Sequence, residues 1–317
     1  KTITKASTSR TAGDEVRVAK SPDPTALTGT TAWTLNGTTV TGTDTLFTTE
    51  LAIGDFISAP DGNWYEVITL TSDTSATLYK KYPSATASGH SSQKLGVTDT
   101  GAAASSSTQV QVVNSSGNSS AFLYISGGWD LSTETQTGQT WFRQMHGTFN
   151  NRYGYGLYMT GKSYTNLGKL NFLRYDYGIY YNNNCNNSTI TSATCNSNNY
   201  GIYYTASSNN TITSATCNSN GTGIYYNNNC NNSTITSATC NSNNYGIYYT
   251  ASSNNTITSA TCNSNGYYGI SYSGSSNNTI YALSTTGNTT AAIYADNASN
   301  ICHSATIAES TKVAMGT

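Results

Sequence analysis

The chain has 317 residues, and only 9% of them are charged, against roughly 25% in typical soluble domains. A formal net charge of −1 leaves no electrostatic footprint for nucleic acid or anionic lipid. No apolar run approaches the roughly 20 residues that span a bilayer. The sequence therefore predicts neither a nucleic-acid partner nor a membrane span, and it is long enough for more than one domain.

The first 121 residues divide into three parts. Residues 1–29 are predicted to be an extended N-terminal segment. Residues 30–84 alternate polar and apolar positions around turn signals such as Gly54-Asp55, which predicts a small β-barrel or sandwich-like module. Residues 85–121, rich in Ser, Thr, Ala and Gly, are predicted to be a linker or irregular β-structure.

The module at 30–84 carries a pattern of the form TVTGT…F…L…GD…W…V. This pattern resembles small β modules of phage tail and other virion proteins. The resemblance implies a role in attachment or assembly rather than in chemistry.

From residue 122 onwards the chain becomes repetitive. Residues 178–221 recur identically at 223–266, and no charged residue or His occurs from Tyr177 to Ala295. The glycines of the recurring Gly-Ile pairs are 22 or 23 residues apart, at Gly178, Gly201, Gly223, Gly246 and Gly269. A repeat of this length is typical of solenoids.

Each repeat contains two strand-like runs, Thr-Ile-Thr and Gly-Ile-Tyr-Tyr, separated by Asn/Ser clusters that favour turns. The 178–266 block has no Leu, which excludes a leucine-rich repeat, and it shows no helical periodicity. The sequence therefore predicts an all-β chain with a parallel β-helix over 122–317, whose regular repeats run from 155 to 310.

The repeat SSNNTITSATCNSNNYGIYY is similar to those of right-handed parallel β-helix proteins, the NosD-like or carbohydrate-binding-and-sugar-hydrolysis class. The resemblance covers about half of the chain and implies the fold. It leaves the function open, because lyases, hydrolases, phage tailspikes and adhesins all use such repeats.

Stacking of coils in register predicts ladders of like residues. One interior ladder comprises Ile190, Ile212, Ile235, Ile257 and Ile280, and another comprises Cys195, Cys217, Cys240 and Cys262. Four cysteines in a line do not form a tetrahedral metal site, so we expect no metal or other cofactor. Reduced thiols in the core are the favoured interpretation, and a disulfide between neighbouring coils is the alternative.

The paired tyrosines predict two aromatic columns, one of which contains Tyr180, Tyr203, Tyr225 and Tyr248. One tyrosine of each pair is expected to face solvent, where a column would bind sugar rings or a neighbouring subunit; the alternative is that the rings only stabilise the solenoid. The Thr-x-Thr runs resemble the flat face of β-helical ice-binding proteins, although ordinary strands are also rich in Thr. Sequons occur at Asn187, Asn209, Asn232, Asn254 and Asn277, so N-glycosylation is an open interpretation.

General acid–base catalysis needs titratable side chains, and the repeats offer only Tyr and Cys. Charged residues and His occur between 130 and 176, at Asp130, Glu134, Arg143, His146, Arg152 and Asp176. No motif joins them, so we expect solvated or paired charges and a chain that is not an enzyme.

The solenoid pattern continues through Ile301 and Ile307 almost to the last residue. An open β-helix edge pairs with another strand unless it is covered, which predicts head-to-tail homo-oligomers that grow as a filament. The expected function is a structural subunit of an extracellular or cell-surface fibre. The alternatives are a trimeric phage tailspike or tail-fibre protein and a carbohydrate-binding surface protein. A start at Lys1 without Met fits removal of a leader and export, or a fragment.

Overall fold

The fold was analysed in a computed structural model of the chain. The structure describes residues 13–19, 21, 23–95, 98–99, 111–113, 116–130, 134–143, 154–308 and 313–315. The chain forms two compact units: residues 21–98 make up most of one, and the other comprises residues 1–20, 99–144 and 152–317.

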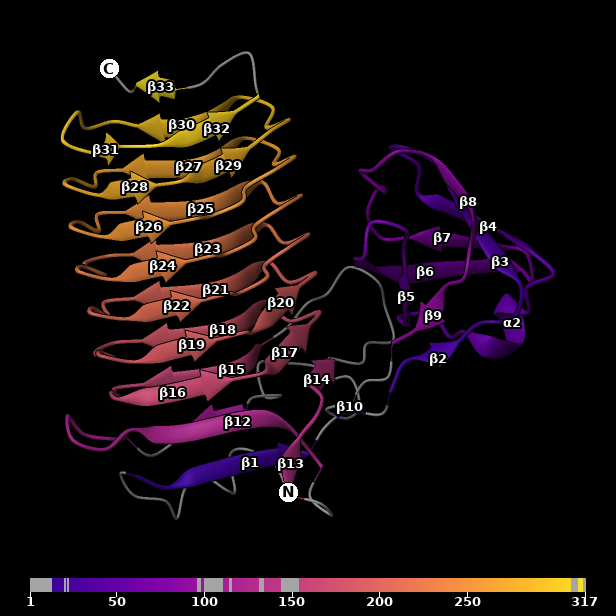
Figure 1. The fold of residues 1–317 in the computed structure, drawn as a ribbon, viewed down its shortest axis with the longest axis horizontal. Helices are drawn as coiled ribbons and strands as arrows, with labels where there is room; N and C mark the ends of the chain where they lie inside the picture. Colours follow the sequence, from indigo (N-terminus) through magenta and orange to yellow (C-terminus); the bar gives the residue numbers. More distant parts are fainter. Residues whose placement is uncertain are drawn as a thin grey trace. The chain divides into compact units, whose positions relative to one another are not determined.

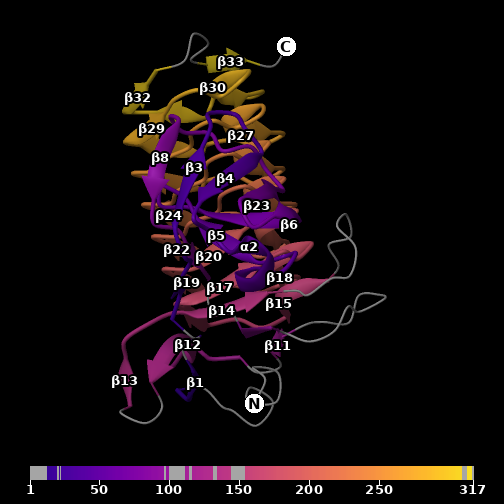
Figure 2. The same ribbon diagram turned by 90° about the vertical axis from the view of Figure 1, so that its right-hand side faces the viewer.

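The larger unit is a parallel β-solenoid whose strands stack coil upon coil (Figures 1 and 2). One sheet has ten strands: β1 (Glu15–Ala19), β12 (Leu123–Asp130), β16 (Thr165–Gly168), β19 (Thr189–Thr191), β22 (Thr211–Thr213), β24 (Thr234–Thr236), β26 (Thr256–Thr258), β28 (Thr279–Tyr281) and β31 (Ile301–Cys302), with β13 (Thr135–Gln136) beside β12. The second has nine: β11 (Gln111–Val113), β15 (Tyr155–Thr160), β18 (Tyr177–Asn182), β21 (Tyr200–Thr205), β23 (Thr222–Asn227), β25 (Tyr245–Thr250), β27 (Tyr268–Ser273), β30 (Ala291–Ala295) and β33 (Val313–Met315).

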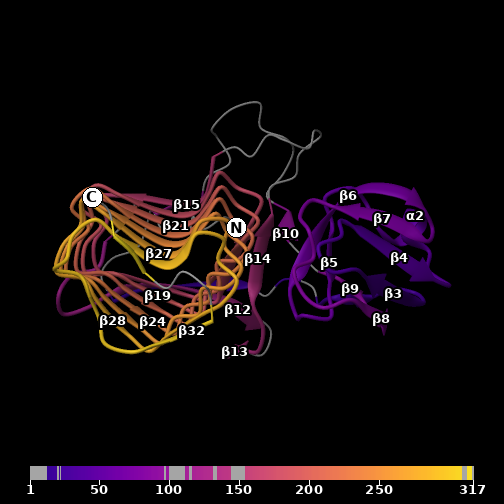
Figure 3. The ribbon, with the colours of Figure 1, turned by 90° about the horizontal axis from the view of Figure 1, so that it is seen from above.

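A third side of the solenoid is narrower. It begins with β10 (Thr98–Asp99), β14 (Thr140–Arg143), β17 (Leu170–Leu173) and β20 (Thr194–Asn196), continues through single parallel bridges, and ends with β29 (Leu283–Thr285) and β32 (Ala305–Ile307). Figure 3, viewed along the stack, shows the nine-stranded and ten-stranded sheets on opposite sides. The predicted all-β fold with a right-handed parallel β-helix is confirmed.

Residues in left-handed conformation turn the chain at the corners. Ser192 and Ser197 and their counterparts in later coils have φ between 52° and 61°, a region that normally favours Gly or Asn. The one-residue difference between coils lies at another corner. Asn183 and Asn184 are both left-handed there, whereas Ala206 alone takes that place in the next coil. A single added left-handed residue therefore explains the alternation of 22 and 23.

Each Gly-Ile pair sits where neighbouring coils approach closely. A Cβ on Gly201 would lie 2.5 Å from the carbonyl oxygen of Gly223 and 3.0 Å from Nδ2 of Asn220. Gly and Ile are both buried, so two consecutive residues face inward and the alternation of the strand shifts by one. Strand side chains normally alternate between faces, and this shift places the first and fourth residues of the strand on the outer surface.

Asn side chains add a second set of axial hydrogen bonds. The backbone N–H of Asn220 donates to Oδ1 of Asn243 at 2.8 Å, and the N–H of Asn243 donates to Oδ1 of Asn265 at 2.9 Å. Each of these amides is buried, where an unpaired polar group would be costly. The Asn-rich turns are therefore part of the core rather than solvated loops.

The smaller unit is an antiparallel eight-stranded sheet. Its order is β2 (Thr25–Ala26), β9 (Gln93–Lys94), β5 (Phe56–Ser58), β6 (Trp64–Ser72), β7 (Ser75–Leu78), β4 (Thr39–Thr43), β3 (Thr30–Trp33) and β8 (Ala87–His90), and the short helix α2 (Phe47–Glu50) follows β4 in the chain. Trp33, Tyr65 and Tyr82 pack together in its core with ring centroids 5.3–5.9 Å apart. A buried Asp55 pairs with Lys94 at 2.8 Å.

The structure places parts of two predicted segments differently from the sequence. Glu15–Ala19, inside the expected extended segment 1–29, pairs in parallel with β12 and forms a rung of the solenoid. The strands at 87–90 and 93–94, inside the expected linker 85–121, belong to the smaller unit, which reaches beyond 30–84. Pairing partners distant in sequence decide these placements. In the described part of the chain, no helix is long and apolar enough to cross a membrane.

Candidate functional site

The interior of the solenoid is built from the predicted ladders. Ile190, Ile212, Ile235, Ile257 and Ile280 occupy matched positions on consecutive strands and are at most 1% exposed. Cys195, Cys217, Cys240 and Cys262 are fully buried free thiols. Burial raises the pKa of Cys195 and Cys240 well above the usual range, because an apolar interior disfavours the thiolate. Because all four side chains of this ladder are fully buried, these cysteines pack in the core as small apolar residues.

The second tyrosine of each pair lies inside. This inner file comprises Tyr181, Tyr204, Tyr226, Tyr249 and Tyr272, stacked with centroids 4.6–5.2 Å apart. The hydroxyl of Tyr181 lies 3.4 Å from that of Thr165. In the part of the chain that the structure describes, the other four hydroxyls have no hydrogen-bond partner. Burial raises the pKa of Tyr226 far above its usual value, so this phenol stays protonated.

The outer tyrosines of the nine-stranded sheet form what we call the tyrosine face. They comprise Tyr155, Tyr158, Tyr177, Tyr180, Tyr200, Tyr203, Tyr225, Tyr245, Tyr248, Tyr268 and Tyr294, all partly exposed. Both outward positions of the strand contribute, because of the inward Gly-Ile pair. Thr222 and Ser271 take the tyrosine position in two strands. The face runs over β15 to β30 without a charged residue from Tyr177 to Ala295.

The rings of the tyrosine face stack on one another. Tyr177 lies 5.0 Å from Tyr200 at an interplanar angle of 12°, and Tyr225 lies 4.9 Å from Tyr248 at 6°. Since neighbouring rings cover each other's flat sides, the exposed parts are ring edges and hydroxyls. Oη of Tyr203 accepts a hydrogen bond from Nδ2 of Asn227 at 2.8 Å. The face is thus an array of phenol groups that can donate and accept hydrogen bonds.

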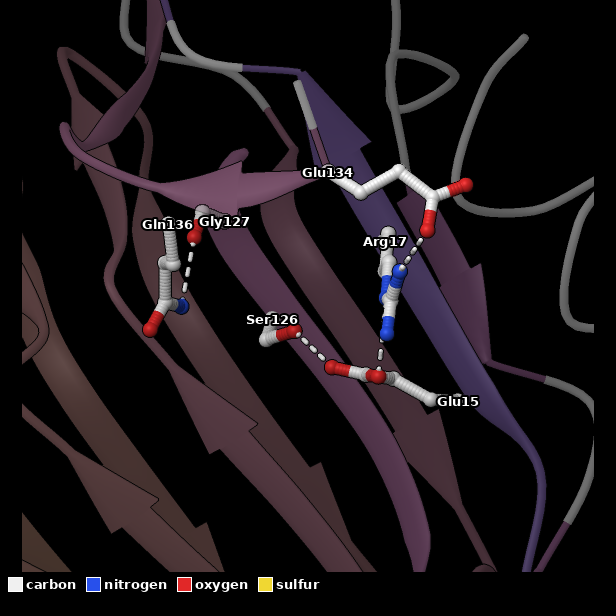
Figure 4. Close-up of polar contacts among 6 residues, drawn as sticks. All are labelled: Glu15, Arg17, Ser126, Gly127, Glu134 and Gln136. Atoms are coloured by element: carbon white, nitrogen blue, oxygen red, sulfur yellow. Dashed lines mark hydrogen bonds and ion pairs between the residues drawn. The ribbon is translucent and has the colours of Figure 1, made fainter. Parts of the chain in front are cut away.

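A charged cluster lies on the first rungs of the solenoid (Figure 4). Nε of Arg17 is 3.0 Å from Oε2 of Glu15, and its Nη1 is 3.9 Å from Oε2 of Glu134. Oγ of Ser126 donates to the other oxygen of Glu15 at 2.5 Å, and Nε2 of Gln136 donates to the carbonyl of Gly127. The cluster brings two carboxylates and a guanidinium together. Sequence reasoning missed it because β1 and β12 are about a hundred residues apart.

The remaining predicted positions are spread over the solenoid. Ile301 is 51% exposed on β31, whereas Ile307 on β32 is partly buried against the core. Asn187, Asn209, Asn232, Asn254 and Asn277 share one corner and have φ between 55° and 60°. Asp176 lies next to the tyrosine face, where Nδ2 of Asn199 donates to it at 3.0 Å. His146 and Arg152, and the side chains of Asp130 and Arg143, lie outside the described residues.

Solved structures with a similar fold include polysaccharide-modifying enzymes. A double mutant of the periplasmic alginate epimerase AlgG is 15% identical, covers 66% of this chain and has a TM-score of 0.44. This chain spans 62% of the AlgG chain. Pectate lyase Pel9A is 13% identical over 69% of this chain and 68% of its own, with a TM-score of 0.42. The viral protein ORF18 of Geobacillus virus E2 is 11% identical over 66% and 51%, with a TM-score of 0.40.

The conclusion, drawn from the sequence, that the chain is not an enzyme is wrong. The similar structures include an epimerase and a lyase. The expectation rested on the uncharged repeats and on the absence of a motif among the charged residues between 130 and 176. The cluster of Glu15, Arg17 and Glu134 supplies titratable groups that the repeat region lacks.

The sequence itself places the chain in a family. No curated protein matches it. A family model described as "Periplasmic copper-binding protein (NosD)" matches residues 132–315, which is more than half of the chain and nearly all of the regular solenoid. The match agrees with the resemblance of the repeats and with the observed fold. The chain belongs to the NosD family of parallel β-helix proteins.

Proposed function

We propose that the protein binds carbohydrate on the tyrosine face. The observation that carries the proposal is a continuous, partly exposed array of stacked tyrosines along one side of the solenoid. Tyrosine combines an apolar ring with a polar tip and is common at binding surfaces. Ordered rings lose little conformational entropy on binding, because their neighbours already fix them.

The chemistry of the face favours a neutral polysaccharide. Between Tyr177 and Ala295 there is no Lys, Arg or His to pair with the carboxylate of a uronic acid. Asp176 adds a negative charge beside Tyr177, Tyr155 and Tyr200, which disfavours an anionic chain. Hydrogen bonds between sugar hydroxyls and the exposed phenols supply the specificity.

Copper, which the family description names, receives no role in this proposal. Among the described residues, no three His, Cys, Asp or Glu side chains come together in a way that would hold a metal ion. Cys195, Cys217, Cys240 and Cys262 form a line, one in each coil, and the buried Cys185 and Cys230 lie in a separate file with Ser207 between them, so these thiols do not converge on a point. The described donor set does not fit a protein copper site.

The proposal is tested by binding to insoluble and soluble neutral polysaccharides, with a polyuronate in parallel. The variant Tyr203→Ser with Tyr225→Ser uses the residue that Ser271 supplies in the same file, so the sheet tolerates it. We expect a loss of about tenfold or more in affinity, equivalent to roughly 1.4 kcal/mol. Tyr124→Ser removes an exposed tyrosine from the ten-stranded sheet and serves as the control. Equal binding by both variants, or a preference for the polyuronate, contradicts the proposal.

The location proposed for this function is extracellular or periplasmic, in keeping with the family description. The predicted homo-oligomeric fibre, with Ile301 and Ile307 in its contact, remains a prediction. Light scattering and electron microscopy of the purified protein test it independently of glycan binding. Filaments would place the tyrosine face on the side of a fibre.

A further inference from the structure

The ten-stranded sheet presents a second regular surface, which we call the threonine face. It consists of the first and third residues of four consecutive strands: Thr189, Thr191, Thr211, Thr213, Thr234, Thr236, Thr256 and Thr258. The central Ile of each strand is buried and both threonines are partly exposed. The eight side chains therefore lie on one outer surface. The ten-stranded sheet that carries them lies opposite the nine-stranded sheet that carries the tyrosine face (Figure 3).

The array repeats in two directions. Thr211 pairs in register with Thr234 and Thr213 with Thr236, and the adjoining strands continue both files. Parallel strands lie about 4.8 Å apart, and two residues along a strand advance roughly 6.6 Å. A β-branched side chain on a strand is restricted at χ1, so hydroxyl and methyl groups recur at nearly fixed positions.

The hydroxyls of this face are available to an external partner. Within the residues that the structure describes, none of the eight side chains makes a hydrogen bond or ionic contact. This differs from the tyrosine face, where Asn227 and Thr250 bind two of the phenols. No charged residue lies in the four strands or in the coils between them. The surface thus offers free hydroxyls between methyl groups. It carries no charged side chain, which would order the surrounding water in a different way.

We infer that the threonine face binds ice. Oxygen atoms on faces of hexagonal ice repeat in two directions at distances close to those of this array. Water molecules held by the hydroxyls, and ordered around the methyl groups, would then continue the lattice of the crystal. The face ends at β28, where Tyr281 pairs with Thr258 and is 44% exposed. Tyr281 interrupts the repeat and limits the ice-matched area to four coils.

The test measures inhibition of ice recrystallisation and thermal hysteresis with the full chain. The double variant Thr213→Tyr with Thr236→Tyr places in the file the residue that Tyr281 already supplies. We expect the wild type to inhibit recrystallisation, and the variant to need a concentration about tenfold higher or more. A second double variant, Thr213→Ser with Thr236→Ser, keeps the hydroxyls and removes the methyl groups, and should lose part of the activity. Circular dichroism and urea midpoints check that both remain folded.

The control is Tyr203→Ser with Tyr225→Ser, on the opposite sheet. It should retain full ice activity while losing glycan binding, so the two proposals fail separately. An inactive wild type, or an unchanged Thr213→Tyr, Thr236→Tyr variant, overturns the inference.

Discussion

Replacing Tyr226 by Phe should make the protein more stable. Tyr226 is fully buried, and its ring stacks between Tyr204 at 4.9 Å and Tyr249 at 5.0 Å. Phe keeps both ring contacts and removes only the hydroxyl, which has no partner in the described part of the chain. Burying an unpaired hydroxyl costs about 1–3 kcal/mol in proteins. Part of that gain is offset by the small space that the lost oxygen leaves, so we expect a net stabilisation of about 1 kcal/mol.

Tyr181→Phe is the matched control in the same file. The hydroxyl of Tyr181 lies 3.4 Å from Oγ1 of Thr165, so its removal loses a contact worth about 0.5–1 kcal/mol at most. Thr165 keeps its hydrogen bond to Ser188 at 3.1 Å. The two substitutions should therefore shift stability in opposite directions.

The assay is urea unfolding followed by circular dichroism, comparing midpoints at equal slope. A Tyr226→Phe protein that is less stable than the wild type by about 1 kcal/mol would refute the reasoning. It would mean that the buried phenol has a partner inside the solenoid.

Four other predictions concern single positions. Gly223→Ala should destabilise the fold by about 1–3 kcal/mol, because its Cβ would lie 2.5 Å from a backbone oxygen of the next coil. Gly266→Ala, whose Cβ would lie 3.4 Å from the nearest atom, should destabilise it much less. Urea unfolding midpoints of the two variants test this difference. Ala251→Gly should stabilise by roughly 0.5–1 kcal/mol, since φ is 46° there; equal midpoints would contradict this. In the native protein only the exposed Cys302 should react rapidly with a thiol reagent, while all seven cysteines react in denaturant; several fast thiols would show that the core opens. Burial raises the pKa of Cys230 to about 11. The buried thiol therefore contributes fully to the stability of the protein below the ordinary thiol pKa, and this contribution is lost as pH rises toward 11. The free energy of unfolding of Cys230→Ser should fall less between pH 9 and 11 than that of the wild type.

The regular part of the fold was predictable because one rule fixes it. Coils in register place like residues together, so the positions of Ile190, Ile212 and Cys195 follow from sequence spacing alone. The orientation of each tyrosine pair did not follow. It depends on the consecutive inward residues Gly178 and Ile179, and that irregularity comes from the close approach of neighbouring coils.

The first rungs of the solenoid were not predictable for a different reason. Glu15 and Arg17 lie in a segment without repeat character, and the strand they form is defined only by its pairing with β12. The charged cluster with Glu134 therefore depends on contacts that no local sequence pattern predicts. Charged residues outside the repeats carried no spacing signal, so the uncharged coils were not sufficient to conclude that the chain is not an enzyme.

The axial direction of the hydrogen bonds has a mechanical consequence. Backbone bonds such as Thr234 N–H to the carbonyl of Asn210, and side-chain bonds such as Asn220 to Asn243, join one coil to the next. A force that pulls the two ends of the solenoid apart loads each rung along its bonds, so the terminal coil peels before the interior yields. Extension should then proceed in steps of 22 or 23 residues at similar force, which would let the rod absorb work gradually under tension instead of breaking at once.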